Sequence, residues 1–219
     1  MEHPRIWLFR DYFKKTNLKP PIIDVGGREK WKETKGYYIL NIEKHKSIDI
    51  IANGEKMPFK DGSIGTIILT EVLEHCENPE KILKECWRVL KKNGEIIVSL
   101  PFFWFYHPDP NDYWRYTKDG LRVLMEKHGF KVIETLTVCR LPLFIVSAIH
   151  GSVSHLLYSV RNIKRIGKFL RYPFSFLSLI LDYIMIPFYY LAYKLERFSS
   201  EEFIYVTTLI KSKKSYEKL

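Results

Sequence analysis

The sequence predicts an α/β fold with a mostly parallel sheet, interrupted near its end by a helical segment. Along residues 22–138, short apolar and often β-branched runs alternate with amphipathic stretches. Alternating strands and helices are typical of parallel sheets with right-handed crossovers. From about residue 141 to residue 200 the chain becomes largely apolar and aromatic, which predicts helices between the sixth strand and the last.

The composition is that of a globular protein with a basic surface. The chain has 219 residues, of which 46% are hydrophobic and 27% charged. Its net charge of +10 favours anionic partners, namely nucleic acid, anionic lipid, or phosphorylated or carboxylated substrates, without choosing among them. Cys76, Cys86 and Cys139 form no Cys-x-x-Cys pair, and no signal peptide is evident. Free thiols in the reducing cytoplasm are therefore expected.

The elements follow in order along the chain. An amphipathic helix is expected over residues 3–16. The first strand, Ile22–Gly26, is apolar almost throughout, as in a buried parallel strand. It runs into Gly26-Gly27, which allow a tight turn and the close approach of a ligand. The other predicted strands are Tyr37–Asn41, Ile48–Ala52, Gly65–Thr70, Glu95–Leu100, Phe130–Val138 and Glu202–Lys211.

Two further helices are predicted beside these strands. Asn78 is a candidate N-cap, Pro79 suits the first helical position, and Asn93-Gly94 is expected to end this helix. The second helix is Thr117–His128, followed by Gly129. In such sheets the ligand lies beyond the carboxyl ends of the strands, where the strand order reverses.

Five segments, in this order, resemble motifs of the class I S-adenosylmethionine-dependent methyltransferases, in particular the small-molecule, type 11-like group. They are Ile23–Gly27, Asn41–Glu43, Ala52–Phe59, Thr70–His75 and Trp87–Glu95. The likeness covers about residues 22–131 and resumes at the last strand. It implies a methyltransferase with a Rossmann-like, seven-stranded sheet whose last strand is antiparallel, and S-adenosylmethionine as cofactor.

The resemblance implies a set of cofactor-binding residues. In the family, an acid at the end of the second strand binds the ribose, but here Asn41 stands at that position. Glu43 lies two residues further on and on the same face of the strand, so it is expected to take the place of the family acid. The alternative is that Glu43 is a solvated surface acid. Asn53 is expected at the adenine edge or in a turn. The predicted set is Asp24, Gly26, Gly27, Asn41, Glu43, Asn53, Gly54, Glu55, Thr70 and Glu71.

Two positions in the first motif carry open alternatives. Asp24 either fixes the loop and faces the methionine ammonium, or caps nearby backbone amides. Arg28 stands where the family usually has a small residue, so its side chain must turn outward or the loop must differ.

The segment Phe102–Thr117 is long for a strand–helix connection and rich in aromatic residues. Its run from His107 to Thr117 also resembles a subgroup of these methyltransferases. The predicted catalytic residues are His107, Tyr113 and Arg115: imidazole is a suitable base for a hydroxyl acceptor, and arginine holds carboxylate or phosphate. The alternative is a polar network that merely fixes the loop.

No metal site is predicted. Glu71 and His75 are one helical turn apart, but no further cluster of ligands is evident in the sequence. A structural or cofactor-lining role is therefore expected for His75.

The predicted domains are a methyltransferase domain, residues 1–140 and 201–219, and a helical insertion, residues 141–200. Leu141–Val160 has no charged residue, a basic stretch from Arg161 to Arg171 follows, and Tyr172–Tyr193 is again apolar. A spanning hairpin would place the basic connector away from the cytosol, against the positive-inside rule. Helices lying on the inner membrane face are favoured, with a lid or a homodimer surface left open.

The expected function is methyl transfer to a small-molecule or to a lipid- or glycan-linked acceptor. Nucleic-acid methylation is an alternative that the charge suggests, but Thr70-Glu71-Val72-Leu73 stands where an Asn/Asp-Pro-Pro-Tyr motif would follow the fourth strand. A non-catalytic adaptor of the same fold at a membrane is a third, suggested by the altered first motif.

Overall fold

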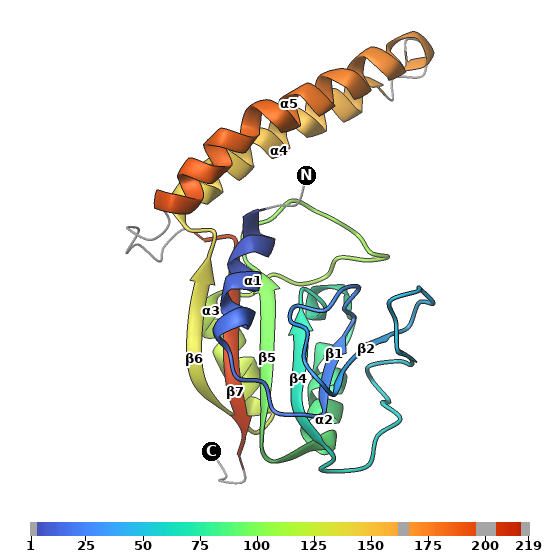
Figure 1. Ribbon diagram of the computed structural model, residues 1–219, viewed down its shortest axis with the longest axis vertical. Coiled ribbons are helices and arrows are strands. Elements are labelled where there is room, and N and C mark those ends of the chain that lie inside the picture. Colours follow the sequence, from blue (N-terminus) through green and yellow to red (C-terminus); the bar gives the residue numbers. More distant parts are fainter. Residues whose placement is uncertain (1–3, 162–166, 196–204, 216–219) are drawn as a thin grey trace. The chain divides into compact units, whose positions relative to one another are not determined.

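The computed structural model describes residues 4–161, 167–195 and 205–215. The chain divides into two compact units, shown as ribbons in Figure 1. The sheet unit comprises Leu8–Val138 and Val206–Leu219, and the helical unit comprises Met1–Trp7 and Cys139–Tyr205. Among the described residues, Cys76, Cys86 and Cys139 form no disulfide bond.

Within the described ranges, seven strands form one sheet in the order β3-β2-β1-β4-β5-β7-β6. Neighbouring strands are parallel except at β7, which is antiparallel to both β5 and β6. The strands are β1 Ile22–Val25, β2 Tyr37–Asn41, β3 Ile50–Ile51, β4 Ile64–Thr70, β5 Leu90–Pro101, β6 Phe130–Val138 and β7 Thr207–Lys214. The predicted fold class is therefore confirmed, including the antiparallel last strand and the helical insertion that precedes it.

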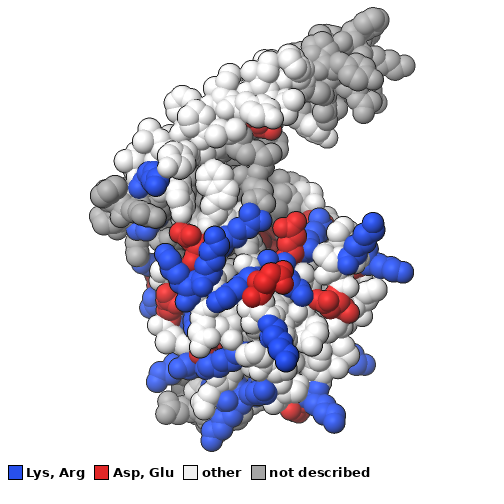
Figure 2. Space-filling view, viewed as in Figure 1, with Lys and Arg blue, Asp and Glu red and all other residues white. Residues whose placement is uncertain are grey.

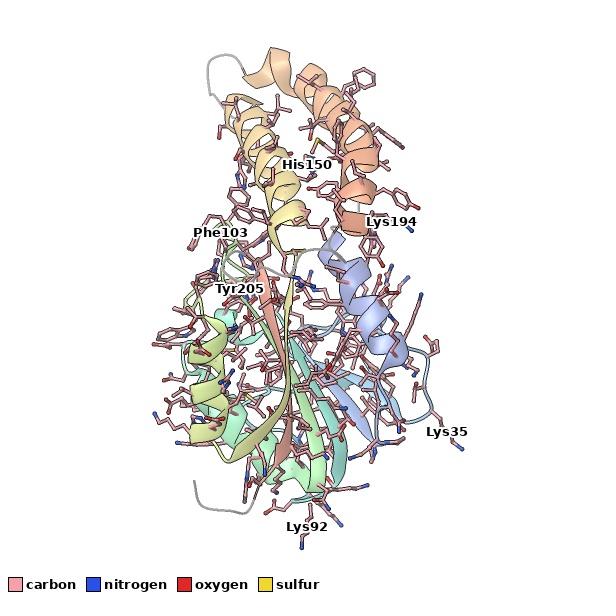
Figure 3. The ribbon with its side chains drawn as sticks, turned by 90° about the vertical axis from the view of Figure 1, so that its left-hand side faces the viewer. Lys35, Lys92, Phe103, His150, Lys194 and Tyr205 are labelled. Carbon is pink, nitrogen blue, oxygen red and sulfur yellow. The ribbon has the colours of Figure 1, made fainter. Side chains whose placement is uncertain are left out.

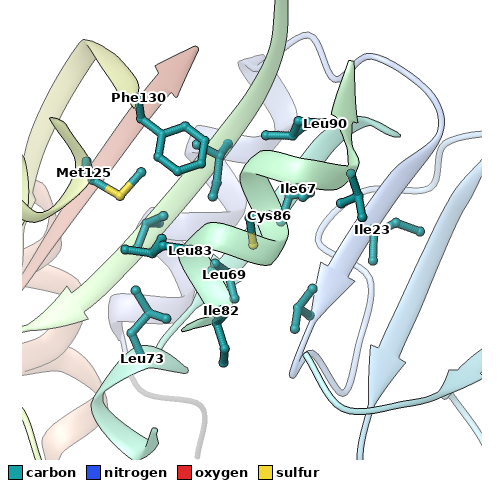
Figure 4. Packing of buried hydrophobic residues seen from close by; sticks show 14 of the residues in the cluster. Ile23, Ile67, Leu69, Leu73, Ile82, Leu83, Cys86, Leu90, Met125 and Phe130 are labelled. Carbon is teal, nitrogen blue, oxygen red and sulfur yellow. The ribbon is translucent and has the colours of Figure 1, made fainter. Parts of the chain in front are cut away.

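Helices cover both faces of the sheet. One face packs against α2 (Pro79–Val89) and α3 (Lys118–Lys127), in a core that includes Ile67, Leu83 and Met125 (Figure 4). The opposite face is covered by the part of α1 (Pro4–Lys15) that belongs to the sheet unit, through residues such as Phe9 and Phe13. Because successive strand residues point to opposite faces, β4 must be apolar at nearly every position.

The segment after α2 differs from the prediction. Asn93-Gly94 was expected to end a helix, but α2 ends at Val89 and both residues lie inside β5. Asn93 has a φ of +65°, and the pairing of β4 with β5 shifts register here. The pair therefore forms a bulge within a long strand, which an Asn-Gly pair accommodates because both residues tolerate positive φ.

Two other boundaries also need correction. Asn78 precedes α2, but its side chain makes no capping hydrogen bond, whereas the Thr117 hydroxyl accepts one from the Gly120 amide at the start of α3. The last strand begins at Thr207 and continues to Lys214, beyond the predicted end at Lys211, because its final residues still pair with the start of β6. Residues 202–204 of the predicted strand lie outside the described residues.

The helical unit contains α4 (Leu141–Arg161) and α5 (Gly167–Leu195), which lie side by side (Figures 1 and 3). His150 connects them: its ring nitrogens lie 3.0 Å from Asp182 Oδ1 and 2.9 Å from the Tyr189 hydroxyl. On α5 the buried residues Met185, Tyr189 and Ala192 recur at helical spacing on one stripe.

Over residues 141–159 and 176–195, the rest of the surface of these two helices is largely apolar and exposed. Among the described residues, Leu141–Ser159 and Phe176–Leu195 are long and apolar enough to cross a membrane, with mean hydropathies of 1.4 and 1.5. Only 11% and 17% of these segments are buried, unlike the core helix of a soluble protein. Figure 2 shows the contrast: charged side chains gather over the sheet unit, and the described parts of α4 and α5 are almost entirely uncharged.

Candidate active site

A cavity of about 360 Å³ opens at the carboxyl ends of β1, β2 and β4. The strand order reverses between β1 and β4, so the cavity lies at the switch point where α/β sheets bind their ligands. Its volume is in the range of small-ligand pockets. Seven of the ten predicted cofactor residues line it: Gly26, Asn41, Glu43, Asn53, Gly54, Glu55 and Glu71. Asp24, Gly27 and Thr70 are not part of this lining.

The turn after β1 requires both of its glycines. Gly26 has a φ of +79°, and a Cβ there would lie 2.6 Å from Val72 Cγ2. A Cβ on Gly27 would lie 2.7 Å from the carboxyl carbon of Asp24, so the turn rests directly on that side chain. Arg28 turns outward, the first of the two arrangements that the sequence allowed; its side chain is 63% exposed.

Asp24 is completely buried beneath this turn. Its Oδ2 accepts a hydrogen bond of 2.7 Å from the Tyr37 hydroxyl, whereas its Oδ1 has no hydrogen-bond partner among the described residues. Burial raises the pKa of this carboxyl group to about 7, because the charged form loses its hydration. Asp24 thus supports the turn by packing against Gly27, while Tyr37 holds its Oδ2 and no described backbone amide donates to its Oδ1.

Asn41 makes contacts that an acid at this position could not make. Its side-chain nitrogen donates hydrogen bonds of 3.2 Å to the carbonyl oxygens of Gly26 and Gly27, and its oxygen accepts one from the Glu43 amide. Asn41 therefore ties the glycine turn to β2. The Glu43 carboxylate lines the cavity and is 66% exposed, and its predicted role in binding the ribose stays a prediction.

Two other predicted cofactor residues have defined local roles. The side-chain oxygen of Asn53 accepts a hydrogen bond from the Glu55 amide, which forms the turn that the sequence offered as one alternative. Glu71, directly after β4, has a φ of +56°, and its Oε1 accepts a hydrogen bond from Ser99 Oγ. Positive φ at a non-glycine residue is costly, and such positions are concentrated at functional sites.

The cavity is locally acidic in a basic protein. Of the charged residues lining it within the described part of the chain, five are acids and one is an arginine. The acids are Glu43, Glu55, Glu71, Glu77 and Asp109. The net charge of the whole chain is +10, so the sign is reversed at this site. Such a lining favours a ligand that carries positive charge.

Arg28 connects the cofactor side of this cavity to the long loop after β5. Its guanidinium lies 3.5 Å from a Glu43 oxygen and 3.3 Å from an Asp109 oxygen. Asp109 and Pro110 belong to that loop. Both residues line the cavity, and Arg28 and His75, which lie outside the loop, line it as well. The predicted cofactor set missed these four, although the sequence singled out the loop that holds Asp109 and Pro110 for its length and its aromatic residues.

The three predicted catalytic residues lie outside the cavity lining. Arg115 donates to both Asp112 oxygens, at 2.5 and 2.7 Å, and the His107 backbone amide donates to Asp112 Oδ2 at 2.9 Å. The Asp112 side chain is 1% exposed, and the Arg115 guanidinium holds its pKa well below the ordinary value. The Tyr113 amide donates to the Glu74 carbonyl, and its ring is 47% exposed. His107, Asp112 and Arg115 thus form a polar network within this loop, and the catalytic roles of His107, Tyr113 and Arg115 stay a prediction.

Comparison with known proteins supports the family resemblance. Residues 34–98 match the family described as "Methyltransferase domain". An uncharacterised protein of Methanocaldococcus jannaschii is 47% identical over 51 residues, which are 23% of this chain and 25% of that protein. A Caenorhabditis elegans protein named 2-methoxy-6-polyprenyl-1,4-benzoquinol methylase, mitochondrial, is 24% identical over 156 residues, 71% of this chain and 46% of that protein.

The fold is shared with solved structures at low sequence identity. The cyclase SpnF superposes with a TM-score of 0.56 at 11% identity, covering 97% of this chain and 81% of that one. The chain spans between a quarter and a half of the length of the two curated relatives above. The family match over residues 34–98 confirms the predicted resemblance to class I S-adenosylmethionine-dependent methyltransferases, while the shared fold leaves the reaction to be argued from the site.

Proposed function

We propose that this chain is an S-adenosylmethionine-dependent methyltransferase whose acceptor is a small molecule, including one linked to a lipid. The observation that carries the proposal is the acidic cavity at the β1/β4 switch point of a basic chain. S-adenosylmethionine carries a cationic sulfonium and a cationic ammonium group, so a negative lining attracts it. The family match over residues 34–98 supports both the activity and the cofactor.

The residues of the cavity fit the parts of this cofactor. Gly26 leaves backbone exposed at the cavity wall, and Glu43 offers a carboxylate to the ribose hydroxyls. Asn53 and Gly54 line the side of the cavity that is formed by the segment after β3, where the family holds the adenine. When bound, the cofactor supplies an electrophilic methyl group. Transfer of that group depends mainly on positioning and the exclusion of water, which the loop of residues 102–117 is placed to provide.

An apolar, lipid-linked acceptor has two independent supports. The C. elegans relative is named for a polyprenyl benzoquinol, an acceptor with an apolar tail. The helical unit exposes many large apolar side chains, among them Ile184, Phe188 and Leu191 at 55%, 54% and 57%. A surface of this kind suits a membrane interface. We therefore place the protein in the cytoplasm, in peripheral contact with the inner membrane face.

Cofactor binding is tested by calorimetry with S-adenosylhomocysteine, comparing Glu43→Ala with Glu33→Ala. Both glutamates are exposed, but Glu33 is not part of the cavity lining. We expect Glu43→Ala to weaken binding about tenfold or more, because charge-assisted hydrogen bonds contribute roughly 1.5–3 kcal/mol. Glu33→Ala should match the wild type. Absence of binding at millimolar ligand would contradict the methyltransferase proposal and favour an adaptor.

Nucleic-acid methylation is the competing enzyme function. Thr70-Glu71-Val72-Leu73 stands at the end of β4, where an Asn/Asp-Pro-Pro-Tyr motif would be expected for that function, and this disfavours it. Filter binding of RNA at increasing salt separates the two: tight binding with a steep salt dependence would favour nucleic acid.

A further inference from the structure

We propose that Glu74, His75 and His107 form a binding site for one divalent transition-metal ion. A carboxylate oxygen and one nitrogen from each imidazole lie within 4.8 Å of one another. From the sequence, the candidate pair is Glu71 and His75 rather than Glu74 and His75, and no metal site is predicted because a further ligand is missing. The fold supplies it from a position 32 residues further along the chain.

The topology explains why these residues meet. Glu74 and His75 lie in η1 (Leu73–His75), which follows β4, and His107 lies in the loop that follows β5. The two strands are parallel neighbours, so both segments leave the sheet at the same edge. The imidazole rings of His75 and His107 are 5.1 Å apart between centroids and nearly perpendicular.

Both imidazoles are held through Nδ1, which leaves Nε2 to bind a metal. His75 Nδ1 lies 2.6 Å from the Asn111 carbonyl oxygen, and His107 Nδ1 lies 2.9 Å from that of Phe105. A carbonyl oxygen can only accept, so each Nδ1 carries the hydrogen and each Nε2 keeps its lone pair. For His107, the Asp112 carboxylate at 3.3 Å favours the same tautomer and outweighs the Arg115 nitrogen at 3.4 Å.

This arrangement is typical of metal-binding histidines, whose second nitrogen donates to a carbonyl or carboxylate that orients the ring. The carboxylate ligand is also well placed, because Glu74 is fully buried and its Oε1 lies 3.9 Å from His75 Nε2.

The ligand set selects the class of ion. Two imidazoles and one carboxylate suit Zn²⁺, Fe²⁺ or Co²⁺ rather than Ca²⁺ or Mg²⁺, which prefer oxygen ligands. Three protein ligands leave coordination positions open, and His75 also lines the cavity described above. The ion would therefore be accessible from the active site. Metal binding itself goes beyond the proposed methyl transfer and does not depend on it.

The test uses the full chain, stripped of metal by a chelator, and no cofactor. Zn²⁺ is titrated by calorimetry, and Co²⁺ by its visible absorption, against the wild type, His75→Gln and His107→Gln. His45→Gln is the matched control, since His45 is exposed and lies outside the cluster. We expect one tight equivalent for the wild type, at least about tenfold weaker binding for both cluster variants, and no change for the control.

Two results would overturn the proposal: a wild-type chain that binds no stoichiometric Zn²⁺, or cluster variants that bind as tightly as the wild type. Circular dichroism verifies that each variant is folded. If a cluster variant does not fold, the decision rests on the wild type, whose Co²⁺ spectrum must report nitrogen and oxygen ligands and whose unfolding temperature must rise with Zn²⁺. Neither readout requires methyltransferase activity.

Discussion

The sheet unit and the helical unit are both rich in apolar residues but treat them in opposite ways. In the sheet unit, Ile68 of β4 and Ile97 of β5 are fully buried between layers. In the helical unit, Ile184 and Tyr183 are 55% and 66% exposed, and burial is confined largely to a narrow stripe on each helix. The sheet unit therefore buries its hydrophobic residues in its own core. The helical unit leaves many of them exposed, on a surface suited to contact with another apolar surface, such as a membrane or a protein.

The polar residues show the same contrast. In the sheet unit they fix the loops around the cavity, since Asn41 holds the glycine turn and Asp112 holds the loop after β5. In the helical unit, His150 pairs with Asp182 and Tyr189 and so joins α4 to α5. Figure 3 labels His150 between the two helices. Polar groups on apolar helices commonly face one another in this way.

The largest expected effect comes from the same substitution made in both units. Ile68→Lys places an unpaired charge in a fully buried position, which costs an amount comparable with the whole stability of a domain, roughly 5–15 kcal/mol. Ile184→Lys changes an exposed position and should alter stability by less than about 0.5 kcal/mol. Circular dichroism and thermal unfolding measure both. If both variants lost their fold to the same extent, the proposed difference between a buried sheet unit and an exposed helical surface would be wrong.

The second effect concerns the buried acid of the sheet unit. Folded Asp24 keeps its proton up to a pKa of about 7, whereas in the unfolded chain the group ionises near 3.8. Its contribution to stability is therefore full below pH 4 and is lost as pH rises towards 7, by about 4 kcal/mol. Asp24→Asn lacks this loss, so its stability relative to the wild type should increase between pH 4 and pH 8 in urea unfolding. If the stabilities of Asp24→Asn and the wild type changed equally with pH, the raised pKa of Asp24 would be contradicted.

A third effect distinguishes the structure from the family pattern. Asn41→Asp restores the usual acid but removes the donor that binds the Gly26 and Gly27 carbonyl oxygens. We expect S-adenosylhomocysteine to bind more weakly, by about 1–3 kcal/mol, because those oxygens lose their partner and face a negative charge. Asn17→Asp, an exposed change outside the cavity lining, is the control. Tighter binding by Asn41→Asp would show that the acid is needed more than the turn.

The smallest effect tests the surface of the helical unit. Leu191→Ser and Val123→Ser both remove an exposed apolar side chain, the first from α5 and the second from α3 of the sheet unit. If α5 contacts a membrane, Leu191→Ser should weaken flotation with anionic vesicles by about 1–2 kcal/mol, roughly five- to thirtyfold. Val123→Ser should leave it unchanged. A wild-type protein that stays in the soluble fraction would favour a lid or a dimer surface instead.

Much of the sheet unit could be predicted because its signals are local. The bounds of Tyr37–Asn41 and Phe130–Val138 agree with the sequence prediction, since both runs are rich in the aromatic and β-branched residues that favour strands. The bulge at Asn93 could not be predicted, because an Asn-Gly pair also ends helices, and only the pairing of β4 with β5 distinguishes the two.

The sequence by itself determined the fold class and the glycine turn, because both depend on short-range pattern and on the order of strands, whereas the seven predicted residues that line the cavity followed from the family resemblance. Only the tertiary structure decided the contacts between distant side chains. It placed Arg28 against Asp109, buried Asp24 beneath Gly27 beside Tyr37, and brought His107 to His75. The physical reason is that such contacts depend on strand register and loop path, which residue spacing along the chain does not specify.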